Sequence, residues 1–124
     1  MHIRIEYDLA FVTATIQFQH QTIILDQVLL DTGSAGTLLA VDKLLPLGLM
    51  LEPSDPIHRI RGVGGSEFVF TKQLEQFSVG ELALSPFEVE VGALAYGFPL
   101  DGIVGLDFLC QVKGHIDLER LILW

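Results

Sequence analysis

The sequence has few of the residues on which several protein classes depend. It contains a single cysteine, Cys110, so no disulfide can form within the chain. Its four histidines lie far apart, without the spacing of zinc ligands, and we expect no metal site. These absences argue against a disulfide framework and against a zinc-stabilised fold.

Basic residues and long apolar runs are also scarce. Only 7 lysines and arginines oppose 16 acidic residues, so the formal net charge is -9. A surface of that sign repels phosphate backbones, and we expect no nucleic-acid partner. No uncharged apolar run approaches the ~18 residues of a membrane span, and the first residues alternate in polarity, unlike the apolar block of a signal peptide. The sequence therefore predicts no membrane partner and a cytoplasmic location.

What remains is enough for one packed domain, which we place at residues 1–124. Half of the residues are hydrophobic and 19% are charged, a balance that is not typical of disordered chains. The length is that of one domain. Because the apolar content exceeds the needs of one small interior, we expect part of it to contact another chain.

Alternation of apolar and polar residues with a period of two dominates the chain. It is clearest over residues 3–9 and 12–18, and further short apolar segments bring the expected number of strands to about eight. Helical patterns are confined to residues 38–45, where Pro46 ends the helix, and to residues 106–112. The pattern predicts an all-β domain with little helix.

One polar motif follows directly on an apolar strand, where Asp31-Thr32-Gly33-Ser34 comes after residues 28–30. A carboxylate in such a place needs hydrogen bonds, and the neighbouring hydroxyls and amides are suitable donors. In the simpler interpretation, Asp31 only forms an Asx turn with its own backbone. In the second interpretation, Asp31 is a functional carboxylate. The four residues alone do not distinguish the two interpretations.

Three motifs in this order resemble those of the retropepsins, the single-domain aspartic proteases of retroviruses and their cellular and bacterial relatives. Residues 28–39 are similar to the catalytic loop, and the glycine-rich segment 62–65 is similar to the tip of the flap. Ile103-Val104-Gly105, with the short helix after it, resembles the closing motif. The resemblance covers most of the chain. It implies a single-domain acid protease barrel with a flap hairpin and one short C-terminal helix.

The resemblance also implies an aspartic endopeptidase, in which two aspartates share one proton and activate a water. Each chain has one Asp-Thr-Gly and supplies half of that pair, so a symmetric homodimer with Asp31 of each subunit on the two-fold axis is implied. Thr32 would then contact the partner's loop, Gly33 would allow close approach of the substrate, and Ser34 would hydrogen-bond the outer carboxylate oxygen. No cofactor is expected.

The resemblance further implies a lid and a groove that bind the peptide. The glycine-rich tip carries one apolar residue, a composition that suits a lid closing over a peptide, although such a tip is also an ordinary hairpin turn. The bound peptide would pair as an added strand, with alternate side chains in apolar pockets that are equally plausible as plain core. The candidate substrate-binding residues are Gly62, Val63, Gly64, Gly65, Leu38, Phe98 and Ile103.

The chain departs from the viral pattern at one ion pair near the interface. Ala35 and Gly36 stand where viral members have acidic residues, and Leu106 stands where they have an arginine. Because both partners are absent together, no unpaired charge remains, but the geometry of the dimer is less constrained.

Three other residues have structural interpretations. We interpret Asp101 as a turn residue and Asp107 as a carboxylate that favours the start of the C-terminal helix. Cys110 is expected to pack on the core side of the same helix. Two alternatives to a protease remain, because fold does not determine function. One is a retropepsin-like dimer that binds peptides or proteins without cutting them, and the other is a purely structural dimer module.

Overall fold

Two long antiparallel strands, β2 (Leu9–Phe18) and β3 (Gln21–Leu30), lie at the centre of the fold. The alternation predicted for the first of them is confirmed, because the even-numbered residues from Val12 to Phe18 are buried. Strand β3 ends at Leu30, so the strand leads directly to Asp31. This hairpin therefore carries the Asp-Thr-Gly motif at the end of a strand, as the sequence predicts.

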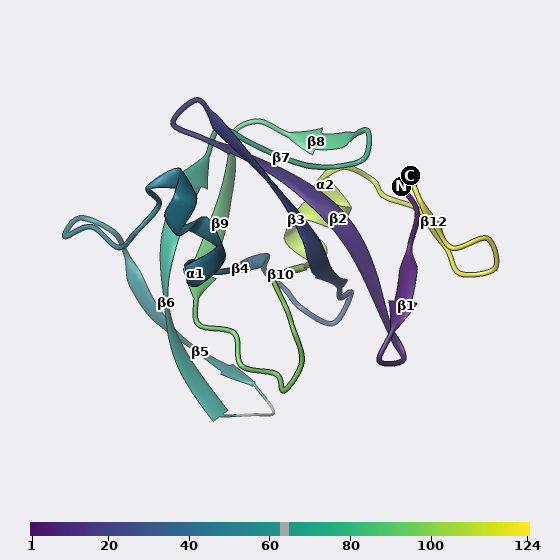
Figure 1. Ribbon diagram of the computed structural model, residues 1–124, viewed down its shortest axis with the longest axis horizontal. Coiled ribbons are helices and arrows are strands. Elements are labelled where there is room, and N and C mark those ends of the chain that lie inside the picture. Colours follow the sequence, from purple (N-terminus) through teal and green to yellow (C-terminus); the bar gives the residue numbers. More distant parts are fainter. Residues whose placement is uncertain (63–64) are drawn as a thin grey trace.

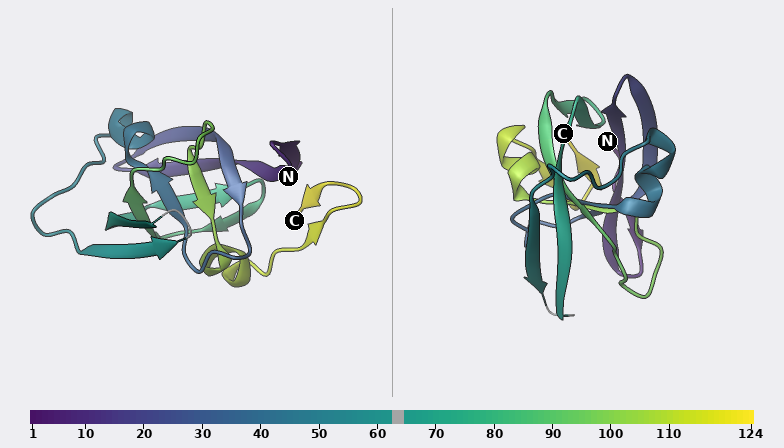
Figure 2. Two further views of the ribbon diagram at one scale, coloured as in Figure 1. Left: turned by 90° about the horizontal axis from the view of Figure 1, so that it is seen from below. Right: turned by 90° about the vertical axis from the view of Figure 1, so that its left-hand side faces the viewer.

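The computed structural model describes residues 1–62 and 65–124, and most of their strands form one 10-stranded sheet (Figures 1 and 2). The other strands of this sheet are β1 (Arg4–Glu6), β4 (Leu38–Ala40), β5 (Ile57–Gly62), β6 (Gly65–Leu74), β7 (Gln76–Val79), β8 (Leu82–Leu84), β9 (Phe87–Gly92) and β10 (Gly102–Val104). The order is β5-β6-β9-β4-β10-β3-β2-β7-β8, and β1 pairs with β2. The predicted all-β class is confirmed.

The expected barrel is not closed. Within the described ranges no pairing joins β5 to β8, the two ends of the strand order. In Figure 1 the β5–β6 hairpin extends toward the bottom of the view, whereas β8 lies near the top. The sheet bends around its core without joining its edges.

The helix predicted over residues 38–45 is only partly present. Leu38–Ala40 forms β4, which pairs with both β9 and β10, and all three of its residues are buried. The helical turns α1 (Val41–Leu44) and η1 (Leu45–Leu47) follow it. Pairing on both sides thus overrides a local pattern that suits a helix.

The C-terminal helix agrees with the sequence in its type and place. Helix α2 (Leu106–Gln111) is followed by the hairpin of β11 (Ile116–Asp117) and β12 (Ile122–Leu123), which lies beside the N-terminus (Figure 1). The prediction for Cys110 is wrong, since its side chain is exposed and the buried side of α2 consists of Phe108 and Leu109. In the described part of the chain, no helix has the length and apolar character needed to cross a membrane.

Two apolar clusters fill the interior. The larger one contains Phe77, Phe87 and Phe108, whose rings pack together with 4.9 Å between the centroids of Phe77 and Phe108. This contact holds α2 against the sheet. The buried members of the smaller cluster come from five different segments that surround the end of β3, and they are Phe11, Leu38, Val69, Leu100 and Ile103.

A buried ion pair ties the loop before β5 to β6. Lys72 is 7% exposed, and its Nζ lies 2.7 Å from Asp55 Oδ2 and 2.8 Å from Glu52 Oε1. Burial by itself would lower the pKa of Lys72, but the hydrogen bonds to Asp55 and Glu52 outweigh it and raise that pKa. The hydrogen bond from Lys72, together with one from the Glu52 backbone, lowers the pKa of Asp55.

Replacing Lys72 by methionine is expected to destabilise the protein in a pH-dependent way. Because the pKa of Asp55 is lowered on folding, its contribution is complete above the ordinary value of 3.8 and is lost as the pH falls through the lowered value. At pH 7 the melting temperature of Lys72→Met should be roughly 3–6 °C below that of the wild type, and in strong acid the difference should vanish. Thermal melts at several pH values measure this.

Lys43→Met is the matched control, since Lys43 is half exposed and its Nζ lies 3.7 Å from Asp101. It should change the melting temperature less at pH 7. Equal shifts for the two variants, or a shift for Lys72→Met that persists in strong acid, would contradict the role given to the buried pair.

Candidate active site

The candidate active site is the loop of residues 31–37, which connects β3 to β4. Strand β10 pairs in parallel with β3, with Val104 opposite Leu30, so the two strands end side by side. The backbone N–H of Asp31 continues this pairing and donates to the Val104 carbonyl at 3.0 Å. The position of Asp31 is therefore determined by two neighbouring strands of the sheet.

Within the loop, the Asp31 carboxylate accepts a hydrogen bond from its own turn. The N–H of Gly33 donates to Asp31 Oδ1 at 2.9 Å, and the N–H of Ser34 donates to the Asp31 carbonyl at 3.2 Å. A Cβ atom at position 33 would lie 3.2 Å from Asp31 Oδ1, which is closer than such contacts usually are. The Asx-type bond is thus present, and glycine gives the carboxylate room to make it.

The other predicted residues of the motif differ in their surroundings. Thr32 and Gly33 are exposed, so both are accessible to another chain. The Ser34 hydroxyl donates to the Gly36 carbonyl at 2.8 Å, whereas the sequence analysis expects it on the carboxylate of Asp31. In the single chain, the Ser34 side chain therefore stabilises the second half of the loop, at Gly36.

Asp101 lies at the opposite end of β10 from this loop. Its carboxylate accepts from the N–H of Gln27 at 3.1 Å, and its own N–H donates to the Gln27 carbonyl at 2.8 Å. Its carbonyl accepts from Ala40 N–H at 2.9 Å. These contacts join the start of β10 to β3 and β4, in agreement with the structural interpretation of Asp101.

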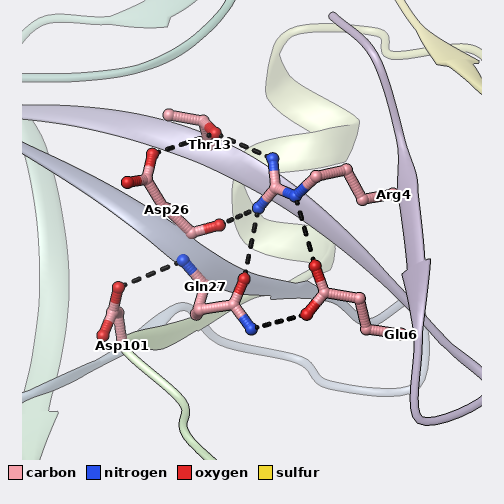
Figure 3. A network of polar contacts seen from close by, with 6 residues as sticks. All are labelled: Arg4, Glu6, Thr13, Asp26, Gln27 and Asp101. Carbon is pink, nitrogen blue, oxygen red and sulfur yellow. Dashed lines mark hydrogen bonds and ion pairs between the residues drawn. The ribbon is translucent and has the colours of Figure 1, made fainter.

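A polar network extends from this point to the N-terminal strand (Figure 3). The Gln27 side chain donates to Glu6 at 3.0 Å, and Glu6 lies 3.7 Å from the guanidinium of Arg4. Arg4 also donates to the Thr13 hydroxyl at 3.0 Å and to the carbonyl of Asp26. The network links β1 and β2 to β3, the strand that ends at the Asp-Thr-Gly motif.

The glycine-rich hairpin has the predicted arms. Strands β5 and β6 pair as far as Gly62 and Gly65, which lie opposite each other. Val63 and Gly64, which the sequence analysis places at the tip of a lid, lie outside the described residues. The role of this hairpin as a lid stays a prediction.

The predicted pocket residues belong to the smaller apolar cluster. Leu38 is 7% exposed and Ile103 is 5% exposed, so both are core residues in the single chain. Phe98 is only partly buried, and its ring stacks on that of Tyr7 with 5.1 Å between the centroids. Of the three, Phe98 is the one that offers an accessible apolar surface.

A cavity of about 530 Å³ lies beside the outer half of the loop. Gly36, Thr37 and Asp107 line one part of it, and Glu88 and Glu90 are among its other lining residues. Asp31 is not a lining residue, so this cavity is separate from the candidate catalytic carboxylate. Across the described ranges, no group of three or more His, Cys, Asp and Glu side chains is arranged to hold a metal ion.

Sequence reasoning missed the contact between Thr37 and Asp107. Thr37 is 1% exposed and donates to Asp107 from both its N–H and its hydroxyl. One signal was available, because Thr37 stands directly before the apolar Leu38 and Leu39, and a buried hydroxyl requires a partner. Nothing in the sequence identified that partner.

Together, these features define a mostly β domain with one Asp-Thr-Gly loop in each chain. The sequence matches the aspartyl protease family over residues 12–108, a span that includes the loop and the start of α2. The chain belongs to the aspartyl protease family, and the resemblance to the retropepsins is confirmed. No curated protein matches the chain.

Proposed function

We propose that the protein is an aspartic endopeptidase that works as a symmetric homodimer. The observation that carries the proposal is the Asp31-Thr32-Gly33 turn at the end of β3, in a chain of the aspartyl protease family. Each chain has one such turn, and the reaction needs two carboxylates. The second carboxylate therefore comes from a second copy.

In the proposed mechanism, the two Asp31 carboxylates share one proton and hold a water between them. The ionised carboxylate takes a proton from the water as it attacks the peptide carbonyl carbon, while the protonated carboxyl gives its proton to the carbonyl oxygen. A proton then passes from the pair to the leaving nitrogen as the C–N bond breaks. The Gly33 N–H supports this chemistry by holding Asp31 Oδ1 in place.

The proposed substrate is an extended peptide segment of a protein. It would pair through its main chain as an added strand, under the hairpin formed by β5 and β6. Phe98 offers an apolar surface to its side chains, and it packs against the apolar cluster that contains Leu38 and Ile103. The single cysteine suits a reducing compartment, and we propose the cytoplasm as the place of action.

The dimer is the first testable part of this proposal. Sedimentation equilibrium is expected to give twice the mass of one chain, because half of a catalytic pair cannot act alone. Thr32 is exposed beside Asp31 and is proposed to hydrogen-bond the partner's loop, so Thr32→Ala should raise the dissociation constant about tenfold.

Thr32→Ser keeps the hydroxyl and serves as the matched control, with a dissociation constant near that of the wild type. A wild-type protein that cleaves peptides while remaining monomeric at every accessible concentration would exclude the shared pair. A dimer that cuts nothing would favour the peptide-binding alternative.

A further inference from the structure

We propose that Asp107 is a positioning residue of the active site, whose carboxylate locks the loop of Asp31 onto the first turn of α2. The effect on cleavage rests on the proposed function, whereas the effect on the loop itself does not. Asp107 is not proposed as a reacting group. It acts through Thr37, the residue at the far end of the same loop.

The Asp107 carboxylate receives three hydrogen bonds. Its Oδ2 accepts from the backbone N–H of Thr37 at 3.0 Å, and its Oδ1 accepts from the Thr37 hydroxyl at 2.7 Å. Oδ1 also accepts from the N–H of Phe108 at 2.8 Å, in the first turn of α2, where the sequence predicts a favourable carboxylate. Two of the three donors therefore belong to the loop and not to the helix.

The neighbours of the Thr37 hydroxyl show that it donates its proton to Asp107. The Thr37 hydroxyl accepts from the N–H of Gly105 at 3.2 Å, so its own proton is available for Asp107. The three groups that contact the Asp107 carboxylate are thus all hydrogen-bond donors, and both carboxylate oxygens must accept hydrogen bonds. An asparagine of the same size would turn an NH2 group toward one of these N–H or O–H groups.

Further bonds extend the attachment along the loop. The N–H of Leu106 donates to the Ser34 carbonyl at 2.8 Å, and the N–H of Asp107 donates to the Ala35 carbonyl at 3.2 Å. At the other end, the N–H of Asp31 is held by β10. The loop is therefore fixed at both ends, by β10 at its start and by α2 at its close.

This arrangement matters for a reaction that needs two carboxylates within sharing distance of one proton. A shift of about 1 Å in a catalytic group can lower the rate about a hundredfold. Releasing residues 34–37 from α2 would remove one of the two constraints on the loop, while leaving the substrate groove in place. The maximum rate should fall more than substrate binding.

The experiment compares Asp107→Asn with Asp101→Asn as the matched control. The Asp101 carboxylate accepts a hydrogen bond from Gln27, which an asparagine oxygen can also accept, and its other contact is the half-exposed Lys43 at 3.7 Å. We expect Asp107→Asn to lower kcat by about 10- to 100-fold with KM changed less than about threefold. Asp101→Asn should keep kcat within about threefold of the wild type.

A second pair of variants tests the contact from the loop side. Thr37→Val removes the hydroxyl at nearly constant volume and should lower kcat like Asp107→Asn, whereas Thr37→Ser keeps the hydroxyl and should restore most of the rate. The double variant Asp107→Asn/Thr37→Val should be no slower than the worse single variant, because both remove the same contact.

Amide hydrogen exchange separates this proposal from the proposed function. The N–H groups of Thr37, Gly105 and Leu106 should exchange at least about tenfold faster in Asp107→Asn, with no change in β2 or in Asp101→Asn. A wild-type protein without cleavage would refute the proposed function, and the exchange data would still decide whether Asp107 holds the loop.

Unchanged exchange at Thr37, a kcat for Asp107→Asn within threefold of the wild type, or additive losses in the double variant would each overturn the proposal. If Asp107→Asn does not fold, the comparison of Thr37→Val with Thr37→Ser decides the matter, and equal rates for that pair would count against the contact.

Discussion

Replacing Asp31 by asparagine is expected to abolish peptide cleavage while leaving the fold and the dimer intact. Asparagine has nearly the same size as aspartate, and its Oδ1 can still accept the N–H of Gly33, which lies 2.9 Å from the carboxylate oxygen. With asparagine in both subunits, however, no side chain of the pair can take a proton from water. The rate should fall at least about a thousandfold.

A diverse peptide mixture, scanned from about pH 3 to 8, measures this loss. The wild type is expected to cleave best on the acidic side of neutrality, because the pair works only with one proton between its two members. Asp101→Asn is the control that keeps cleavage, since Asp101 contacts β3 and β4 and lies away from the loop. Equal cleavage by the wild type and by Asp31→Asn would refute the proposed mechanism.

A methyl group at position 105 is expected to disrupt the contact between the Asp31 loop and α2. A Cβ atom there would lie 2.4 Å from the Gly36 carbonyl oxygen and 2.7 Å from that of Ser34. Both atoms belong to the backbone, so no side chain can rotate away. The φ angle of Gly105 is -107°, which any residue adopts, and the loss is therefore purely steric. Gly105→Ala should lose about 3 kcal/mol of stability.

In a thermal melt, that loss corresponds to a fall of about 10 °C or more, and cleavage should be lost with it. Gly36→Ala is the matched control on the other side of the contact, because a Cβ at position 36 meets no atom within 4 Å. Its melting temperature should stay within a few degrees of the wild type. If Gly105→Ala melts with the wild type, α2 is not held against the loop as closely as the structure has it.

Local signals explain the parts of the fold and site that were predictable. The two-residue alternation in β2, the apolar run of β3 and the turn residues Asp31 and Gly33 each depend on a few neighbours in the chain. The helix after Gly105 and the strands next to Gly62 and Gly65 are likewise predicted from short patterns of neighbouring residues. For this reason the sequence predicts that Asp31 lies in a turn at the end of a strand.

Long-range packing decided the features that sequence reasoning missed or misjudged. Residues 38–40 have a helical pattern, but strands on both sides make them a strand. The exposure of Cys110 depends on which side of α2 meets the phenylalanine cluster.

By itself, the sequence determined the all-β class, the family and the position of the Asp-Thr-Gly motif, because each of these is expressed in short patterns of neighbouring residues. Only the tertiary structure decided that the sheet stays open, that Leu38 and Ile103 are buried in the core, and that the loop is attached to α2. Thr37 and Asp107 are 70 residues apart, and a hydrogen bond between them depends on how β3, β10 and α2 pack together. Local patterns carry no information about such a partner, since many other polar residues of the chain are equally able to accept from Thr37.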